Sequence, residues 1–194
     1  YKSNIKTSLL QQGLMKSFEG DDPSDEDVLS YAQTYVSSFD GAKRSSHILF
    51  DADDTETAQS VLDQINAGTL DFAEAAKTYS KDSSGQNGGD VGWDKLNSFV
   101  SEYTAGLADL SKGQVSGLVT SSYGIHIIKC TDEFHAPDEL TSLDQLPSEF
   151  VDQFRSSLKS LNQSKAYQQW LSDAKENADI EIKDMPRGLP YDLD

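Results

Sequence analysis

The sequence has almost no cysteine and few basic residues. Its single cysteine, Cys130, excludes an internal disulfide framework and a zinc site made of several cysteines. Lysine and arginine number 16 against 33 aspartate and glutamate residues, giving a net charge of −17. Such a charge argues against binding of nucleic acid or anionic lipid through a broad basic surface. No apolar run is long enough to span a membrane. The first residue is Tyr1 rather than methionine, so the start of the chain carries no information about a signal peptide.

Motifs of several enzyme classes are missing as well. No serine lies in a Gly-x-Ser-x-Gly elbow, which disfavours a Ser-His-Asp hydrolase. Gly88 and Gly89 lack the Gly-Lys-Ser/Thr ending of a phosphate-binding loop and more simply mark a tight turn. A metal site made of His47, His126, His135 and a carboxylate stays open, although a ligand spacing such as HExxH is absent. We expect no cofactor and no bound metal.

Hydrophobic periodicity predicts two helices within residues 1–39, interrupted at 19–23. Ser24 is a plausible N-cap of the second helix, because Asp27 follows three residues later. Apolar residues recur at helical spacing in both helices, at Ile5, Leu9, Leu10, Leu14 and Phe18 and at Val28, Ala32, Tyr35, Val36 and Phe39. We expect these apolar faces to be buried.

Residues 45–134 predict a mixture of strands and short helices. The expected order is a strand at 45–50, helices with apolar stripes over 58–65 and 72–79, a short strand near 91–93, a helix over 99–110, and strands at 115–120 and 125–131 that form a hairpin. Helices gathered beside a small, largely antiparallel sheet define an α+β domain.

The last part of the chain returns to helix over residues 144–176. Its apolar side is made of Phe150, Phe154, Leu158, Leu161, Trp170 and Leu171. Residues 180–182 fit a short strand and residues 185–194 a loose tail. Because the helices before and after the middle region have apolar faces that they cannot bury alone, we predict that they pack on one another. The predicted domains are therefore 1–43 and 136–194, two parts of one helical domain, and 44–135, the inserted α+β domain.

Two of the predicted strands carry one histidine each, His47 and His126. Alternation along a strand puts His47 on the same face as Leu49, and His126 on the same face as Ile128. If the two strands are neighbours, both imidazoles converge over one face of the sheet beside the glycine-rich segment 80–93. A single histidine is more often structural than functional, whereas this pair beside a polar loop indicates a site.

Five segments around the histidines resemble the parvulins, a family of peptidyl-prolyl cis–trans isomerases. These segments lie in the order of the family at 46–49, 79–84, 88–93, 112–117 and 123–128, a more specific signal than any one motif. The flanking helices are similar in layout to extracytoplasmic PrsA-type foldases of Gram-positive bacteria and, more distantly, to periplasmic SurA-type chaperones. The resemblance implies an α+β fold in which a parvulin-like small antiparallel sheet with surrounding helices is inserted into a helical chaperone-like domain.

The resemblance also implies a set of site residues. His47 and His126 correspond to the paired histidines of the active-site floor, and Asp82 and Ser121 complete the catalytic set. The proline ring is expected to contact Val91, Phe99 and Tyr103, where leucine, methionine and phenylalanine are more usual in the family.

Isomerisation of an X-Pro bond breaks no covalent bond, although its barrier is ~18–20 kcal/mol. A site needs only to hold the ring, desolvate the amide and favour the twisted form. We therefore predict that His47, Asp82, Ser121 and His126 form a hydrogen-bonded network rather than a set of proton-transfer groups.

The charge near the site predicts the kind of substrate. Residues 51–56 contain four acidic residues and no basic one, and residues 45–134 contain 5 Lys/Arg against 14 Asp/Glu. Because this charge repels phosphate, we expect unphosphorylated X-Pro segments, basic or apolar, in unfolded or partly folded polypeptides.

The predicted function is a peptidyl-prolyl isomerase and foldase that assists exported bacterial proteins outside the cytoplasmic membrane. By the resemblance, the protein is associated with the cell membrane or cell wall, and both a lipid anchor upstream of Tyr1 and a homodimer are open alternatives. Two other functions stay open. One is a holdase chaperone whose parvulin module is weak or inactive, and the other is a purely structural or docking module.

Overall fold

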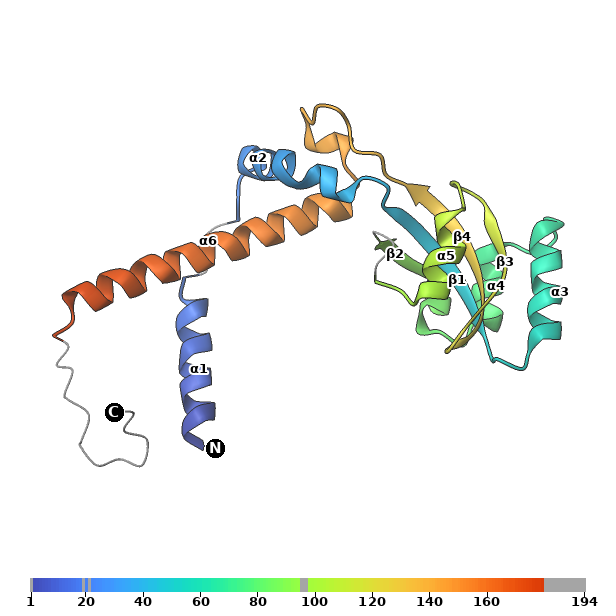
Figure 1. Ribbon diagram of the computed structural model, residues 1–194, viewed down its shortest axis with the longest axis horizontal. Coiled ribbons are helices and arrows are strands. Elements are labelled where there is room, and N and C mark those ends of the chain that lie inside the picture. Colours follow the sequence, from blue (N-terminus) through green and yellow to red (C-terminus); the bar gives the residue numbers. More distant parts are fainter. Residues whose placement is uncertain (1, 19, 21, 95–97, 180–194) are drawn as a thin grey trace, which may run out of the picture. The chain divides into compact units, whose positions relative to one another are not determined.

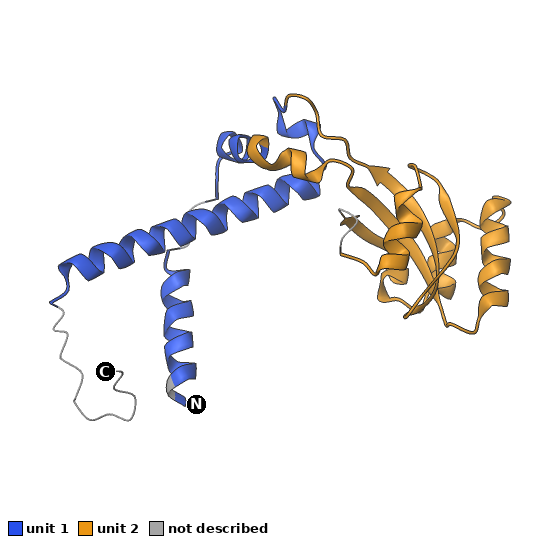
Figure 2. Cartoon of the chain, in the orientation of Figure 1, with its two compact units in different colours: residues 1–32, 140–194 blue, residues 33–139 orange. Residues whose placement is uncertain are grey.

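The computed structural model describes residues 2–18, 20, 22–94 and 98–179, and the chain divides into two compact units (Figure 2). Unit 1 joins residues 1–32 to residues 140–194, and unit 2 is the continuous segment 33–139. Unit 2 therefore includes residues 33–43 and 136–139, which lie in the helical part of the predicted domain division.

Unit 2 contains four strands and three α-helices among its described residues (Figure 1). They follow in the order β1 (Lys43–Phe50), α3 (Thr55–Asn66), α4 (Phe72–Tyr79), β2 (Asp90–Asp94), α5 (Ser101–Ala108), β3 (Val115–Ser121) and β4 (Gly124–Glu133). Short 3-10 helices η1 (Val36–Phe39) and η2 (Ser83–Asn87) precede β1 and β2. This is the order predicted from the sequence, with η2 in a segment that had no predicted element.

The sheet has the strand order β2-β1-β4-β3, and all neighbouring strands are antiparallel. The predicted neighbourhood of the two histidine-bearing strands is confirmed, because β1 and β4 pair along their whole length, with Leu49 opposite His126 and His47 opposite Ile128. Strands β3 and β4 form a tight hairpin in which Ser121 pairs with Gly124.

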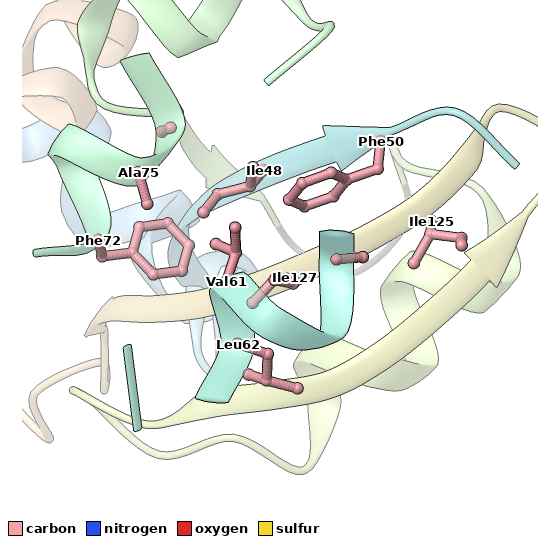
Figure 3. Close-up of a cluster of buried hydrophobic side chains, with 10 residues drawn as sticks. Ile48, Phe50, Val61, Leu62, Phe72, Ala75, Ile125 and Ile127 are labelled. Atoms are coloured by element: carbon pink, nitrogen blue, oxygen red, sulfur yellow. The ribbon is translucent and has the colours of Figure 1, made fainter. Parts of the chain in front are cut away.

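The two faces of this sheet bury different sets of side chains. One face packs against α3 and α4 through an apolar cluster (Figure 3), whose members include Ile48, Phe50, Val61, Leu62, Phe72, Ala75, Ile125 and Ile127. The other face packs against α5 through Tyr103, Leu107, Ile128 and Cys130. Because successive residues of a strand point to opposite faces, Ile127 and Ile128 fall into different clusters. The histidines lie on the face of the second cluster.

Unit 1 contains α1 (Lys2–Lys16), most of α2 (Asp25–Tyr35), the 3-10 helix η3 (Leu143–Gln145) and the 30-residue α6 (Ser148–Asn177). Arg155 of α6 donates to the carbonyl of Pro23 at 2.7 Å and to the carboxylate of Asp25 at 2.6 Å. Gln163 donates to the carbonyl of Met15 at 2.7 Å. The amino-terminal helices thus contact the carboxy-terminal helix through polar as well as apolar groups.

Part of the predicted burial in the helical region is wrong. Phe150 and Phe154 are buried, and the predicted Ser24 cap is confirmed by a hydrogen bond from the Asp27 N–H to the Ser24 hydroxyl. Large apolar side chains are instead exposed at Ile5, Leu9, Leu10, Tyr35, Leu161 and Trp170. An aromatic contact with α6 is made just after α1 ends, where the Phe18 ring lies edge-on to Tyr167 and tilted against Trp170.

None of the described helices combines the length and the apolar character needed to cross a bilayer. The short strand predicted at 180–182 and the tail predicted at 185–194 lie outside the described residues.

Candidate active site

The two histidines of the sheet contact each other directly. His47 Nδ1 lies 3.2 Å from His126 Nδ1, and the two imidazole rings are stacked with 5.4 Å between centroids and 17° between planes. Both residues are buried, with 7% and 4% of their surface exposed. Burial of a polar ring costs free energy unless its nitrogens have hydrogen-bonding or charged partners.

Two glycines allow the backbone to hold these histidines in place. Gly89 has a φ of 81°, and a Cβ there would lie 2.2 Å from the His47 carbonyl oxygen. The His47 N–H donates to the Gly89 carbonyl at 2.9 Å, so the turn at 88–89 is tied to the strand at the histidine. Gly124 begins β4 with a φ of 138°, and a Cβ there would lie 2.1 Å from the Phe50 carbonyl oxygen. Only glycine fits such close backbone approaches.

Each histidine has a second polar neighbour. His126 Nε2 lies 2.7 Å from the Ser121 hydroxyl oxygen, and His47 Nε2 lies 3.4 Å from Asp82 Oδ1. His47 Nε2 has no hydrogen-bond partner among the described residues, so its contact with the Asp82 carboxylate is electrostatic. Asp82 caps η2, because its Oδ1 also accepts from the Ser84 N–H at 2.8 Å.

Burial keeps both imidazoles neutral near pH 7. Desolvation, with a further contribution from His47, lowers the pKa of His126 from 6.5 to about 4. Desolvation also lowers the pKa of His47, although Asp82 opposes the shift. Hydrogen bonding by Ser84 lowers the pKa of the Asp82 carboxyl. The pair of rings therefore carries no charge, while Asp82 is ionised.

The ionised Asp82 fixes the direction of the hydrogen bonds in this chain of groups. A lone pair on His47 Nε2 would be repelled by the carboxylate, so this nitrogen carries the proton. Nδ1 of neutral His47 then accepts from the Nδ1–H of His126, and Nε2 of His126 accepts from the Ser121 hydroxyl. The Ser121 oxygen in turn accepts from the Tyr123 N–H at 3.1 Å. Each of these groups thus has a donor or acceptor role that agrees with the roles of its neighbours.

A pocket of about 290 Å³ opens over the histidines. Its lining residues are His47, Leu49, Asp82, Val91, Ser98, Phe99, Val100, Tyr103, Tyr123 and His126. Val91 enters the pocket from a β-bulge, because Ser45 pairs with Gly92 and Ser46 with Asp90, which leaves Val91 without a register partner. Bulges of this kind redirect a side chain. The pocket thus has apolar walls at Leu49, Val91, Phe99 and Val100, and its ionisable groups at the floor and edge are two imidazoles and one carboxylate.

Tyr103 connects the walls of the pocket to its floor. Its ring is 2% exposed and lies edge-to-face with His47 and with His126, 5.6 Å from each and at 76° and 87°. The Tyr103 ring also contacts Phe99, with 4.6 Å between centroids. An aromatic ring in this arrangement favours fixed orientations of its neighbours.

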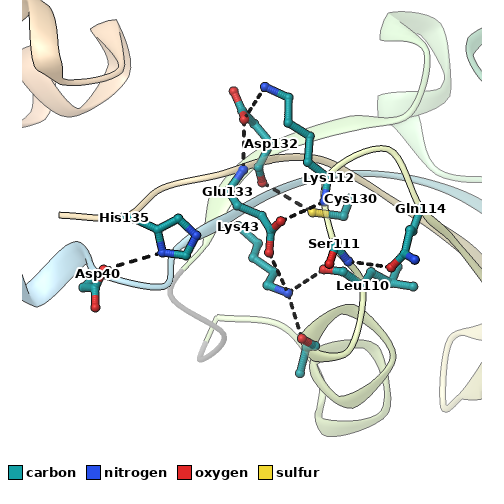
Figure 4. A network of polar contacts seen from close by, with 11 residues as sticks. Asp40, Lys43, Leu110, Ser111, Lys112, Gln114, Cys130, Asp132, Glu133 and His135 are labelled. Atoms are coloured by element: carbon teal, nitrogen blue, oxygen red, sulfur yellow. Dashed lines mark hydrogen bonds and ion pairs between the residues drawn. The ribbon is translucent and has the colours of Figure 1, made fainter. Parts of the chain in front are cut away.

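Lys43 fixes the carboxyl end of α5, the helix that carries Tyr103 (Figure 4). Its ammonium group donates to the carbonyls of Ala108 at 2.7 Å and Leu110 at 2.5 Å and pairs with Glu133 at 3.2 Å. A cation at this position satisfies the last carbonyls of a helix and complements its dipole. Lys43 of β1 therefore ties the carboxyl end of α5 to the sheet.

The structure brings together all seven residues predicted for the site. His47, Asp82, Val91, Phe99, Tyr103 and His126 line the pocket, and Ser121 lies beside them through its bond to His126. Their catalytic and binding roles stay predictions.

Four further residues line the pocket that were not predicted as site residues: Leu49, Ser98, Val100 and Tyr123. Strand alternation was a usable signal for Leu49, which shares a face with His47. Tyr123 lies in the two-residue turn of the hairpin and is 71% exposed, so no periodic pattern marks it.

The alternative of a metal site finds no support in the described part of the chain. The third histidine, His135, does not contact the pair in the described part of the chain. Its side chain is 80% exposed and lies 3.9 Å from the Asp40 carboxylate. No three His, Cys, Asp or Glu side chains among the described residues are grouped to hold a metal ion.

Comparison with known proteins identifies the same region. Residues 47–132 match the family model "Rotamase: PPIC-type PPIASE domain". The foldase protein PrsA of Bacillus subtilis is 34% identical over 184 residues, which cover 94% of this chain and 57% of that protein. A chaperone SurA of Albidiferax ferrireducens is 30% identical over 151 residues, which cover 74% of this chain and 31% of that protein.

A solved structure agrees with these sequence matches. The crystal structure of PrsA from Bacillus subtilis is similar with a TM-score of 0.52 and 31% identity, over 94% of this chain and 65% of that chain. The chain spans 57% of the PrsA protein and 31% of the SurA protein that it matches. Residues 47–132 of this chain therefore form a PpiC-type peptidyl-prolyl isomerase domain of the parvulin family, within a chain whose layout is similar to that of the PrsA foldases.

Proposed function

We propose that this protein is a peptidyl-prolyl cis–trans isomerase that acts on X-Pro bonds of unfolded or partly folded polypeptides. The observation that carries the proposal is the apolar pocket of about 290 Å³ whose floor is the neutral pair His47 and His126. A proline ring without hydrogen-bonding groups fits apolar walls, and the X-Pro amide, whose nitrogen belongs to that ring, then lies against the polar floor.

The pocket favours the twisted amide over the planar one in two ways. Walls made of Leu49, Val91 and Phe99 remove water from the amide, and a less polar environment disfavours the charge-separated resonance form that keeps the amide planar. Rotation itself then needs no proton transfer, so neutral imidazoles that only orient one another suit the reaction.

The carboxylate of Asp82 adds an electrostatic contribution. It is ionised, lies at the pocket edge with its side chain 37% exposed, and repels negative charge on a nearby carbonyl oxygen. That oxygen carries more negative charge in the planar amide than in the twisted one, because twisting removes the resonance. Repulsion therefore raises the ground state more than the transition state.

Substrate preference follows from the rim. Lys81, a basic residue at this edge of the pocket, forms an ion pair with Asp51 at 3.1 Å, so its charge is compensated. Asp53 and Asp54 are two more acidic residues of the same loop. The exposed ring of Tyr123 lies at the same end of the sheet, because Phe50 pairs with Ile125. This rim suits unphosphorylated segments that are apolar or basic around the proline and repels phosphate.

A protease-coupled assay with a proline peptide tests the proposal. The wild-type protein should accelerate isomerisation, and His126→Ala should lower kcat/KM by about 10- to 100-fold, since it removes two hydrogen bonds of the floor. His135→Ala is the matched control, because it removes a histidine that is 80% exposed and outside the pocket. Equal activity of the wild type and His126→Ala, or no acceleration by the wild type, would refute the proposal.

A second function, holdase activity, is favoured by the exposed apolar side chains of unit 1. Ile5, Leu9 and Leu10 of α1 are 43%, 61% and 64% exposed, a surface that can bind unfolded chains. Suppression of aggregation by the wild type and its loss in a Leu9→Ser, Leu10→Ser variant with full isomerase activity would establish this function. Unchanged suppression in that variant would assign the holdase activity to another surface, and a wild type that does not suppress aggregation would exclude this function.

The similarity to PrsA foldases and SurA chaperones supports polypeptide partners and a location outside the cytoplasm as parts of this proposal. Attachment to the cell membrane or cell wall through an upstream lipid anchor and formation of a homodimer belong to it as further expectations. The net charge of −17 supports the absence of nucleic acid among the partners.

A further inference from the structure

Tyr103 is the only aromatic ring among the described pocket residues that contacts both imidazoles, and its hydroxyl has a buried partner. The Tyr103 hydroxyl lies 3.0 Å from the Ser45 hydroxyl. Ser45 is fully buried, at 0% exposure. Desolvation raises the pKa of Tyr103 to about 12, although the bond with Ser45 opposes the shift, so the phenol is protonated near neutral pH.

The strands around Ser45 are shaped to present this hydroxyl. In the pairing of β1 with β2 the register shifts directly after Ser45, and in the pairing with β4 it shifts directly before Ser45. Val91 on one side and Thr131 on the other are the extra residues. Bulges increase the local twist and redirect side chains. Alternation places Ser45 on the same face as His47 and Leu49, beneath the ring of Tyr103.

A phenol bonded at its far end keeps its place beside the histidines. A swing of the Tyr103 side chain about its Cα–Cβ bond would carry the hydroxyl away from Ser45 and leave two hydroxyls buried without partners, which is unfavourable. The ring stands nearly perpendicular to both imidazoles, so a fixed ring limits the rotation of His47 and His126 and keeps water from their edges. The hydrogen bond from His126 to His47 depends on both effects.

We propose that Ser45 is a positioning residue of the isomerase site, which acts through Tyr103 to hold the two imidazoles in register. Ser45 itself contacts no substrate. Its role rests on the proposed isomerase function, but its effect on the histidines can be measured without turnover.

The test compares Ser45→Ala, Tyr103→Phe and the double variant. Each single variant leaves one buried hydroxyl unpaired, whereas the double variant removes both. We expect Ser45→Ala to lower kcat by about 5- to 10-fold with a change in KM of less than about 2-fold, because the apolar walls that bind proline are unchanged. The double variant should lose no more activity than either single variant.

Ser116→Ala is the matched control. Ser116 is also a buried serine of the sheet, 8% exposed, and its hydroxyl bonds the Gly117 carbonyl and the Ile128 N–H, but it has no contact with Tyr103 among its hydrogen bonds. We expect this variant to lose stability while keeping kcat and KM.

NMR titration of the histidine rings distinguishes a positioning role of Ser45 from a purely structural one, because a structural role would leave the titration midpoint of His126 unchanged. In Ser45→Ala the titration midpoint of His126 should rise from about 4 toward 6.5, because a loosened Tyr103 admits water. In Ser116→Ala the midpoint of His126 should be the same as in the wild type. Unchanged kcat together with an unchanged His126 midpoint in folded Ser45→Ala would overturn the proposal, as would losses in the double variant that multiply those of the single variants. A wild type without isomerase activity would instead defeat the proposed function, and the titration would still decide the role of Ser45.

Discussion

The two faces of the sheet in unit 2 are built from the same strands but use their residues differently. On one face Ile48, Phe50 and Ile127 join a cluster without polar groups against α3 and α4. On the other face His47 and His126 sit among the residues of the pocket. A polar floor contributes less to stability than an apolar one of the same size. The comparison indicates that one face supports the fold and the other carries the chemistry.

The largest expected effect comes from the apolar face. Phe50→Ala should lower the free energy of unfolding by about 3–5 kcal/mol, because Phe50 is 1% exposed within the cluster. Urea denaturation measures the loss. Leu49→Ala is the adjacent control on the pocket face. We expect it to lower kcat/KM clearly and to lower the free energy of unfolding by less than Phe50→Ala does. A larger loss of stability from Leu49→Ala than from Phe50→Ala would break the comparison.

The pocket face should make stability depend on pH. The pKa of His126 is lowered from 6.5 to about 4 in the folded protein, so the unfolded chain binds this proton first as the pH falls. The contribution is complete above pH 6.5 and is lost progressively between pH 6.5 and about 4, by about 3 kcal/mol in total. His126→Asn should therefore lose less stability than the wild type over this window. Parallel curves for the two proteins would contradict the assignment.

Much of the architecture follows from periodicity. Alternation along 45–50 and 125–131 predicts both strands and the shared face of the histidines, and the stripes at 58–65 and 72–79 predict the helices of the apolar face. Burial on α1 was predicted wrongly, because periodicity shows that Leu9 and Leu10 share a stripe but does not show whether another surface covers it.

The site was less accessible to sequence reasoning than the fold. The seven predicted residues depend mainly on the resemblance to parvulins, whereas Tyr123 and Ser98 reach the pocket from a turn and a loop, where no period applies. The Ser45–Tyr103 bond depends on two register shifts and on the depth at which α5 packs. Such quantities are set by tertiary contacts and leave no local pattern.

A charge substitution at the pocket edge sharpens the comparison further. Asp82→Asn keeps the shape of the side chain but removes the charge that repels the planar amide, and we expect kcat/KM to fall by about 10-fold. Asp63→Asn is the control and should keep full activity, because the Asp63 carboxylate lies on the exposed side of α3, where it accepts a hydrogen bond from Gln59. Equal rates for Asp82→Asn and the wild type would remove the electrostatic contribution from the account.

The smallest expected effect concerns peptide charge. Of three matched peptides with Ala-Pro, Arg-Pro and phosphoserine-Pro, the phosphorylated one should have the lowest kcat/KM, by about 5-fold at low salt, and the difference should shrink as salt screens the rim. Competition between the peptides in one assay measures the ratio directly. A preference for the phosphopeptide would contradict the role assigned to the acidic loop.

Exchange NMR on an unphosphorylated X-Pro peptide tests the central claim most directly, because it observes interconversion of the cis and trans forms without a coupled protease. The account predicts exchange cross-peaks at catalytic amounts of the wild-type protein and their near loss with a folded Asp82→Ala, His126→Ala double variant. Cross-peaks of equal intensity with both proteins, or none with the wild type, would contradict it.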